Sequence, residues 1–263
     1  MVNKPIKRTQ SSEFVKAYTK EGTNDAIMEE FEQLGFTKAQ SKQVANRAKY
    51  MSKKMINRDG DKIRVYVFCI TGGPCAGKTT SLQYLSERFS PRFKVFILPE
   101  TATMTVSAGV TIIPSEFTPD THTNFTKGIM KHQMDVEQYF YEFAKNEKKD
   151  VIIFTDRGMM DNTAYCTPEV ADRVFRETGW TKQKITNDRY DAVFHLVTAA
   201  DGAEAFYTVE NNEARTEGVA LARMIDKWLQ NAWVDHQNHF IIDNSVPGFN
   251  LKIERLYKAI SNF

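Results

Sequence analysis

A glycine-rich stretch that ends in a lysine and two threonines has the residue types of a phosphate-binding loop. It reads GGPCAGKTT and fits the Walker A spacing, in which four residues separate the first glycine from Gly-Lys-Thr. Glycines allow backbone N–H groups to wrap a triphosphate, and the start of a following helix favours negative charge. We expect Lys78 to reach the β- and γ-phosphates and the Thr79 hydroxyl to hold Mg²⁺. The nucleotide-binding residues predicted by this motif are Gly72, Gly73, Pro74, Cys75, Ala76, Gly77, Lys78, Thr79 and Thr80.

A glutamate follows the next apolar stretch of the chain. Residues 94–98 read KVFIL, and Pro99 and Glu100 come directly after them. Ligands of parallel sheets lie beyond the carboxyl ends of the strands, which is where we expect Glu100. Its carboxylate could act as a general base or organise Mg²⁺ through a water molecule. The alternative is an acidic residue near a helix start that is stabilised by the helix dipole.

An Asp-Arg-Gly triplet follows a further apolar stretch. Residues 151–155 read VIIFT, and Asp156 and Arg157 come next. A carboxylate after a buried strand, downstream of a Walker A loop, is typical of a Walker B site and would hold Mg²⁺ or its water. Arg157 would then pair with a phosphate or an anionic acceptor. The alternative is that Asp156 caps the following helix while Arg157 forms a surface ion pair.

Polar residues in the last third of the chain could complete the site. Residues 199–223 contain Arg215 and Arg223 and suit a mobile lid whose arginines close over the transferring phosphoryl group. The alternative is a surface hairpin with solvated arginines. Asp243 and Asn244 follow the last apolar stretch and could contact an adenine or guanine ring.

A parallel sheet is needed to bring these residues together. Five apolar stretches have the composition of strands, at residues 65–71, 94–98, 151–155, 192–198 and 240–242. Helical patterns lie between and after them, at residues 79–89, 124–145, 168–177, 216–237 and 249–260. Strands that alternate with helices imply one sheet with right-handed crossovers. The predicted fold class is therefore α/β, with a five-stranded parallel sheet flanked by helices.

The helix expected at 124–145 carries two polar side chains close to its apolar face. Gln133 and Glu137 either look into the cleft of the site or form a solvent-exposed pair. The preceding segment 109–123 contains two prolines and is expected to be a loop that contacts a substrate, and His195 is expected to be a core histidine. The residues of this helix that are predicted to be core recur at steps of three and four: Phe125, Ile129, Val136, Phe140 and Phe143.

Length and composition indicate a globular protein. The chain has 263 residues, of which 41% are hydrophobic, and its net charge of +2 gives no general reason to expect a nucleic-acid partner. No apolar stretch approaches the roughly 20 residues that a membrane span needs, and the N-terminus lacks the apolar centre of a secretory signal. The three cysteines are an odd number and favour reduced thiols. We therefore expect a cytoplasmic protein that meets membranes or a large assembly only through partners.

The N-terminal part differs from the rest in charge. Residues 1–64 hold 14 Lys and Arg against 8 Asp and Glu, and amphipathic helical patterns run through them. We predict a helical N-terminal extension over residues 1–62 and a nucleotide-binding domain over residues 63–263. A protein partner could bind residues 1–60.

Several motifs together resemble one family. They are ITGGPCAGKTT, LPETAT, FTDRG and the long block from YDAVFHLVTAADGAEAFYT to NNEART. From about Val65 onward the chain is similar to the AAA-type P-loop family that includes the kinase domain of bacterial nicotinamide riboside kinase and the TRPL-translocation-defect nucleotide-binding proteins of eukaryotes. The block from Tyr190 to Arg215 points to this subgroup, whereas the Walker element alone is generic. One departure is Ala76, where relatives often have a further glycine.

The resemblance implies a P-loop NTPase fold of the nucleoside and nucleotide kinase-like kind that binds ATP or GTP with Mg²⁺. Related nucleoside kinases use the carboxylate after the second strand to activate the acceptor hydroxyl, and Glu100 occupies that position. For the insect member, the resemblance implies a role in membrane-protein trafficking with binding of GTP and phosphoinositides. A phosphoinositide is therefore a second candidate acceptor.

Two functions follow from these patterns. The first is a phosphotransferase on a small hydroxyl-bearing, nucleoside-like substrate, with Glu100 as the base, Asp156 on the metal and lid arginines at the transferring group. The second is a GTP- or ATP-binding regulatory, trafficking or structural scaffold protein with little or no turnover. No NKxD-like motif is present, so any preference for GTP would come from other contacts.

Overall fold

A computed structural model describes residues 55–58, 61–111, 113, 116–207 and 218–262, together with Glu32 and Lys38. The chain divides into two compact units. The larger unit, Met55–Leu256, contains the sheet. The other unit comprises Met1–Lys54 and Tyr257–Phe263, where the structure describes the end of helix α10 (Phe249–Ser261). The domain boundary at residue 62 stays a prediction, and the proposed partner-binding extension lies almost wholly outside the described residues.

Strands and helices alternate along the larger unit as predicted. The sequence does not predict β1, α5 or α7, and α9 is shorter than the helix expected at 216–237. The strands are β1 (Met55–Arg58), β2 (Asp61–Gly72), β3 (Lys94–Leu98), β4 (Val151–Asp156), β5 (Ala192–Leu196) and β6 (His239–Ile242). The remaining helices are α4 (Lys78–Phe89), α5 (Thr101–Ser107), α6 (Pro119–Ala144), α7 (Asp161–Ala164), α8 (Pro168–Thr178), a π-helix (Lys184–Asp188), a 3₁₀-helix (Glu204–Phe206) and α9 (Val219–Ala232).

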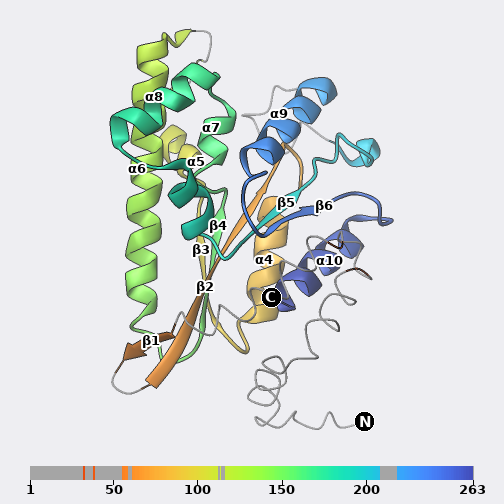
Figure 1. The fold of residues 1–263 in the computed structure, drawn as a ribbon. Coiled ribbons are helices and arrows are strands. Elements are labelled where there is room, and N and C mark those ends of the chain that lie inside the picture. Colours follow the sequence, from red (N-terminus) through yellow and green to blue (C-terminus); the bar gives the residue numbers. More distant parts are fainter. Residues whose placement is uncertain are drawn as a thin grey trace. The chain divides into compact units, whose positions relative to one another are not determined.

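Five of the strands form the predicted parallel sheet, in the order β3-β4-β2-β5-β6 (Figure 1). The strand β1 pairs antiparallel with the start of β2. The register aligns the carboxyl ends of the central strands, since Ile70 lies opposite Asp156 and Gly72 opposite Leu196. This edge of the sheet is therefore where residues that follow different strands meet, and it is where ligands of such sheets bind.

Helices cover both faces of the sheet, with α4 on one side and α6 on the other (Figure 1). Cys69 of β2 belongs to a buried cluster that includes Met130 of α6. The neighbouring Phe68 points to the opposite face, where its ring centroid lies 6.1 Å from that of Phe154, which lies 6.1 Å from that of Phe89 in α4. Because both faces are covered, the central strands are apolar along nearly their whole length, which is why they were recognisable in the sequence.

The helix α6 begins earlier than predicted. Residues 119–123 belong to it, so the expectation that 109–123 is a loop is wrong for the last part of that segment. The start has a local cause, because the Thr118 hydroxyl accepts a hydrogen bond from the Thr121 N–H and a proline occupies the first helical position.

The buried face of α6 also differs from the predicted one. Ile129 is buried, but Phe143 is 44% exposed, so its assignment to the core is wrong. Gln133 and Glu137 are buried instead. The buried face of α6 thus includes two polar side chains, and part of the apolar stripe predicted from the sequence lies outside it.

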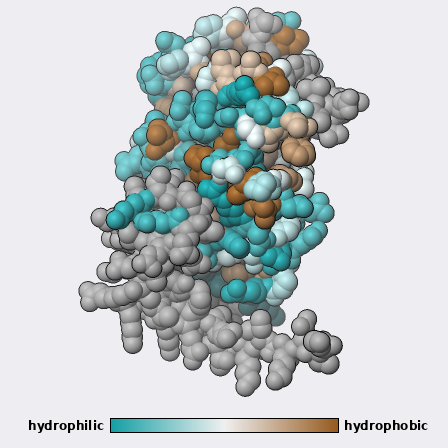
Figure 2. Space-filling model, turned by 90° about the vertical axis from the view of Figure 1, so that its right-hand side faces the viewer, coloured by the Kyte–Doolittle hydropathy of each residue, from teal (hydrophilic) through white to brown (hydrophobic). Residues whose placement is uncertain are grey.

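The surface of the described residues is mixed in character. Figure 2 shows hydrophobic side chains as separate spots between hydrophilic ones on the face turned to the viewer. Within the described ranges, none of the helices has the length and the run of apolar residues that a membrane crossing needs.

Packing at Gly158 can be tested by adding a methyl group. A Cβ atom there would lie 2.5 Å from the Trp233 ring and 2.8 Å from Sγ of Cys69, so Gly158→Ala should lower the free energy of unfolding by about 1–3 kcal/mol. A Cβ at Gly128 in α6 meets nothing within 4 Å, so Gly128→Ala should instead raise it by about 0.5–1 kcal/mol. Urea denaturation of both variants measures the two effects. Equal stability of Gly158→Ala and the wild type would contradict this packing.

Candidate active site

The glycine-rich loop joins β2 to α4 and is shaped by two glycines with positive φ. The φ angles are 145° at Gly72 and 85° at Gly77. A Cβ atom would lie 2.1 Å from the carbonyl oxygen of Leu196 at the first position and 2.2 Å from the ring of Phe249 at the second. Both contacts are too short for any side chain, so glycine is required at both ends of the loop.

Lys78 is the first residue of α4 and reaches back across the loop. Its Nζ donates to the carbonyl oxygen of Gly72 at 3.2 Å. Burial and the neighbouring charge of Arg157 lower the pKa of Lys78 to about 8. Gly77 caps α4 without a side chain, which leaves the first N–H groups of the helix to an external acceptor.

Arg157 connects the ends of three strands. Its Nε donates to Oε1 of Glu100 at 2.5 Å, and its NH1 donates to the carbonyl oxygen of Gly72 at 3.3 Å. The Thr103 hydroxyl donates to the other oxygen of Glu100 at 3.0 Å. Burial alone would raise the pKa of Glu100, but the positive charges of Arg157 and Lys78 outweigh it, and the pKa is lowered. Glu100 is thus held as an ionised carboxylate beside the loop.

Asp156 has a carboxylate oxygen that could bind a cation. Its Oδ1 is buried and has no hydrogen-bond partner among the described residues. Burial raises the pKa of Asp156, although the charge of Lys78 opposes this. Nowhere in the described ranges do three His, Cys, Asp or Glu side chains converge as a metal site. The pair of Asp156 and the Thr79 hydroxyl still fits Mg²⁺, which is commonly bound by one or two carboxylates together with substrate phosphates.

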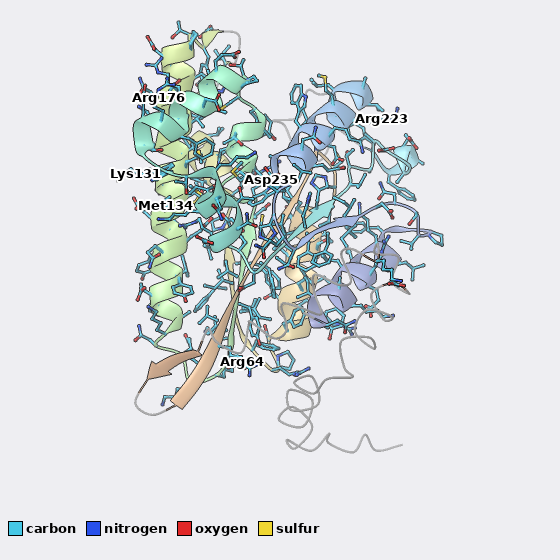
Figure 3. All side chains as sticks on the ribbon, in the orientation of Figure 1. Arg64, Lys131, Met134, Arg176, Arg223 and Asp235 are labelled. Carbon is cyan, nitrogen blue, oxygen red and sulfur yellow. The ribbon has the colours of Figure 1, made fainter. Side chains whose placement is uncertain are left out.

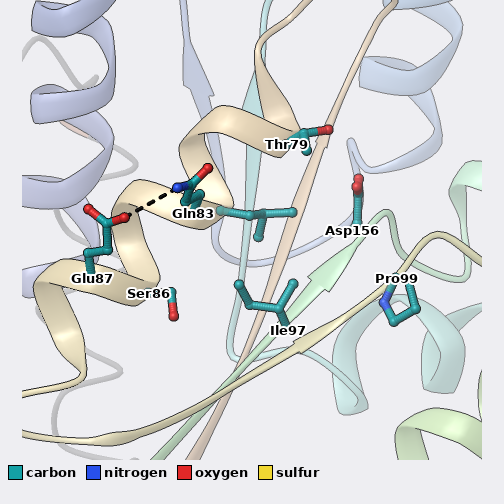
Figure 4. A pocket seen from close by; sticks show the side chains of 8 residues that line it. Thr79, Gln83, Ser86, Glu87, Ile97, Pro99 and Asp156 are labelled. Carbon is teal, nitrogen blue, oxygen red and sulfur yellow. Dashed lines mark hydrogen bonds between the residues drawn. The ribbon is translucent and has the colours of Figure 1, made fainter. Parts of the chain in front are cut away.

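A cleft of about 530 Å³ opens beside these two residues (Figure 4). Thr79 and Asp156 lie at one end of it, and the polar side chains of α4 lie at the other, where Nε2 of Gln83 donates to Glu87 at 3.3 Å. Apolar side chains form the floor between the two ends. The full lining is Thr79, Leu82, Gln83, Ser86, Glu87, Ile97, Pro99 and Asp156.

The middle of the loop is tied to the segment that follows β5. The Thr198 hydroxyl donates to the carbonyl oxygen of Pro74, and the Ala199 N–H donates to that of Cys75 at 3.3 Å. Cys75 itself has a φ of 55°, which is uncommon for a residue with a side chain. The loop is therefore fixed from the side of β5 as well as by its own glycines.

The two predicted lid arginines have different outcomes. Arg215 lies outside the described residues. Arg223 is on α9 (Figure 3), where its Nε donates to the carbonyl oxygen of Ala200 and its NH2 to Glu204, both at 2.5 Å. Arg223 thus holds the segment after β5 and does not reach the cluster around Lys78 in this structure. Its role at a phosphoryl group stays a prediction.

Asn244 is also engaged with the segment after β5. Its amide nitrogen donates to the carbonyl oxygens of Thr198 and Asp201 at 2.8 and 2.6 Å. Its oxygen accepts a hydrogen bond from the buried Nζ of Lys252 at 2.8 Å, and the same Nζ lies 3.5 Å from the carbonyl oxygen of Ala76. Asn244 therefore positions the wall of the site, and a contact with a nucleotide base stays a prediction.

Asp243 points to a cation of α10. Its Oδ1 accepts hydrogen bonds from NH1 of Arg255 at 2.7 Å and from the Ser245 hydroxyl at 2.5 Å. Burial would raise the pKa of Asp243, but these two partners lower it. A base contact by Asp243 would have to compete with this ion pair.

The structure shows two supporting residues whose role the sequence left open. Gln133 is buried and donates to the carbonyl oxygen of Arg157 at 3.2 Å and to Glu137 at 3.0 Å. Glu137 accepts two further hydrogen bonds from Arg189 and one from Tyr190. The alternative of a solvent-exposed pair is therefore wrong, because both side chains are buried and Gln133 supports the backbone of Arg157, whose φ is 70°. Their signal in the sequence was a polar pair, four residues apart, beside an apolar helix face.

Asp161 is a further supporting residue, and the sequence did not predict its role. One of its oxygens accepts from the Thr71 hydroxyl at 2.8 Å and from Nε1 of Trp233 at 2.7 Å, and the other accepts from the Gly158 N–H at 2.8 Å. It is 1% exposed and joins the ends of β2 and β4. A single aspartate at the start of a short helix gives no signal of such a role.

Comparison with known proteins agrees with this picture. A family model described as an AAA domain matches residues 67–248. The matched range includes the loop from Gly72 to Thr80 and the cluster of Glu100, Asp156 and Arg157. No curated protein matches the chain.

The affinity for a nucleotide should depend on the charge of Lys78. This charge is present below a pKa of about 8 and is lost as the pH rises through that value. Between pH 7.5 and 9.5 the dissociation constant of Mg-ATP or Mg-GTP should therefore increase by about 20-fold, if the bound phosphate keeps the lysine protonated. Calorimetric titration at both pH values measures this increase.

Lys78→Arg is the matched control, because arginine keeps its charge throughout this range. The variant should lose the pH dependence even though Lys252, whose pKa burial also lowers to about 8, is still present. A wild-type affinity that is the same at both pH values would rule out the assigned role of Lys78.

Proposed function

The chain belongs to the AAA domain family of P-loop nucleotide-binding proteins, and we propose that it is a Mg²⁺-dependent phosphotransferase that takes its phosphate from ATP or GTP. The acceptor in this proposal is a small hydroxyl-bearing, nucleoside-like molecule. The observation that carries the proposal is the meeting of Glu100 with Arg157, Lys78 and the phosphate loop at the carboxyl end of the sheet. A general base for transfer would need a carboxylate at this place, and Glu100 lies two residues after β3.

In this proposal the loop and Lys78 hold the phosphates. The hydroxyl of Thr79 and the unpartnered oxygen of Asp156 hold Mg²⁺, which neutralises charge on the transferring group when it is bound. Arg157 is close enough to the loop to turn from Gly72 toward a γ-phosphate. Catalysis then consists of positioning and of stabilising charge.

Glu100 would accept the proton of the acceptor hydroxyl. Its ion pair with Arg157 lowers its pKa, and a carboxylate with a lowered pKa is a weak base. If Arg157 turns toward the phosphate, Glu100 loses this partner and its pKa rises. Binding of the nucleotide would thus prepare the base.

The cleft beside Thr79 and Asp156 is the proposed acceptor site. The proposed base Glu100 is not part of its lining but directly follows the lining residue Pro99. Its lining includes the carboxylate of Glu87 as well as the proposed metal ligand Asp156 and, among the described residues, no lysine or arginine. The Glu87 carboxylate would repel an anionic acceptor and accept hydrogen bonds from a neutral or cationic one. The apolar floor suits a planar ring. These features favour a nucleoside-like acceptor over a phosphoinositide.

A nucleotide-binding regulatory or trafficking protein with little turnover is the second candidate. The closed Glu100–Arg157 ion pair favours it, because a protein that keeps this pair closed would bind a nucleotide without activating an acceptor. Any protein partner would then bind through residues 1–60, which lie almost wholly outside the described residues. For both candidate functions, the cytoplasmic location of the protein stays a prediction.

The deciding experiment measures nucleotide consumption with Mg-ATP and with Mg-GTP, each with and without pooled nucleosides or phosphoinositide vesicles. Consumption that requires nucleosides and disappears in Lys78→Ala supports the phosphotransferase. A wild-type protein that binds the nucleotide with no turnover under any condition supports the second candidate instead.

Glu100→Gln should reduce transfer by about 10²–10⁴-fold, because a general base is removed, while the nucleotide still binds. Steady-state rates and a separate binding titration measure the two effects. Glu142→Gln provides the matched control, because Glu142 is an exposed residue of α6 that pairs with Lys145. Turnover by Glu100→Gln at the rate of this control would refute the assigned role of Glu100.

A further inference from the structure

A buried carboxylate lies behind the phosphate loop. Asp226 of α9 is 1% exposed. Its Oδ1 accepts hydrogen bonds from the Gly73 N–H at 2.9 Å, from the Thr198 N–H at 3.1 Å and from Nε2 of His195 at 3.0 Å. Its Oδ2 accepts one from Gln230 at 2.8 Å. One side chain thus joins α9, the end of β5 and the second residue of the loop.

The loop is fitted closely to this carboxylate. A Cβ atom at Gly73 would lie 2.6 Å from Oδ1 and 2.9 Å from Cβ of Asp226. Glycine is therefore needed at this position so that the loop backbone can approach α9. Since the Gly73 N–H is already bonded to Asp226, it is directed to the protein interior and leaves the phosphate to other groups of the loop.

The surroundings of Asp226 keep its carboxylate ionised. Burial would raise the pKa of Asp226, but the bonds from His195, Gly73 and Thr198 outweigh it and lower the pKa. A buried charge is costly unless its hydrogen bonds are complete, and here both oxygens are engaged. Hydrogen bonds to an ionised acceptor are also shorter and stronger than neutral ones.

We propose that Asp226 is a positioning residue for the phosphate loop. It fixes the backbone at Gly73, and through Thr198, whose hydroxyl bonds to Pro74, it also fixes the middle of the loop. A triphosphate then binds to a loop that is already in its binding shape and pays no cost for ordering it. The inference rests on the proposed nucleotide binding at this loop, since Asp226 does not touch the ligand itself.

The test compares Asp226→Ala, which removes the acceptor, with Asp226→Asn, which keeps one oxygen but loses the charge. The probes are Mg-tripolyphosphate, which has no base or sugar, and Mg-ATP or Mg-GTP. Asp226→Ala should weaken both by the same factor of about tenfold or more, because a charged hydrogen bond to the loop is lost. Asp226→Asn should restore part of the affinity and remain at least about threefold weaker than the wild type.

A matched control is Asp235→Asn. Asp235 lies just after α9 (Figure 3), where it forms an exposed ion pair with Lys182. This variant should bind both probes as the wild type does. The melting temperature of each variant, measured without ligand, separates a loss of stability from a loss of affinity in the folded protein.

Affinity within threefold of the wild type in both Asp226 variants would overturn the proposal, even if their melting temperatures fall. If Asp226→Ala shows no cooperative unfolding and is therefore not folded, Asp226→Asn alone is used. An affinity of Asp226→Asn within threefold of the wild type then overturns the proposal. A wild-type protein that binds none of the probes would refute the proposed nucleotide binding itself, which is a separate outcome. Equal weakening of both probes supports positioning of the loop, whereas weakening of the nucleotides alone would contradict it.

Discussion

Two partly buried cations meet at one atom, the carbonyl oxygen of Gly72, which accepts hydrogen bonds from Lys78 and Arg157. Like charges repel each other more strongly where water is partly excluded. The lowered pKa of Lys78 reflects both its burial and the nearby charge of Arg157. Glu100 and Asp156 bring negative charge from the ends of the neighbouring strands and partly offset this repulsion. The negative charge of a bound polyphosphate would offset it further, so the two cations favour an anionic ligand at the loop.

Buried polar groups hold this arrangement from two sides. Gln133 and Glu137 of α6 support the backbone of Arg157 on one side. Asp226 of α9 supports the loop on the other. Apolar packing tolerates small shifts, whereas a buried hydrogen-bonded network has one arrangement that satisfies all its members. The position of the charges is therefore defined more sharply than the hydrophobic core alone would allow.

The ion pair between Glu100 and Arg157 is the point at which the two candidate functions differ. While it is closed, the carboxylate is a weak base and Nε of the guanidinium is bonded to Glu100. Opening it would free a base and a phosphate ligand in one movement. In the proposed phosphotransferase, a rotation of Arg157 would open this pair, and the acceptor would bind in the cleft lined by Asp156.

The glycine-rich loop, the five parallel strands and the places of Glu100 and Asp156 after two of them could be predicted from the sequence, because each depends on contiguous residues whose backbone preferences and burial are local. The pairing of the buried polar groups could not be predicted in this way. Asp226 lies 153 residues from Gly73, and Gln133 lies 24 from Arg157. Such partners depend on which helices become neighbours once the sheet has formed. A polar residue on an apolar helix face therefore indicates that it has a buried partner, but which residue this partner is depends on the tertiary structure.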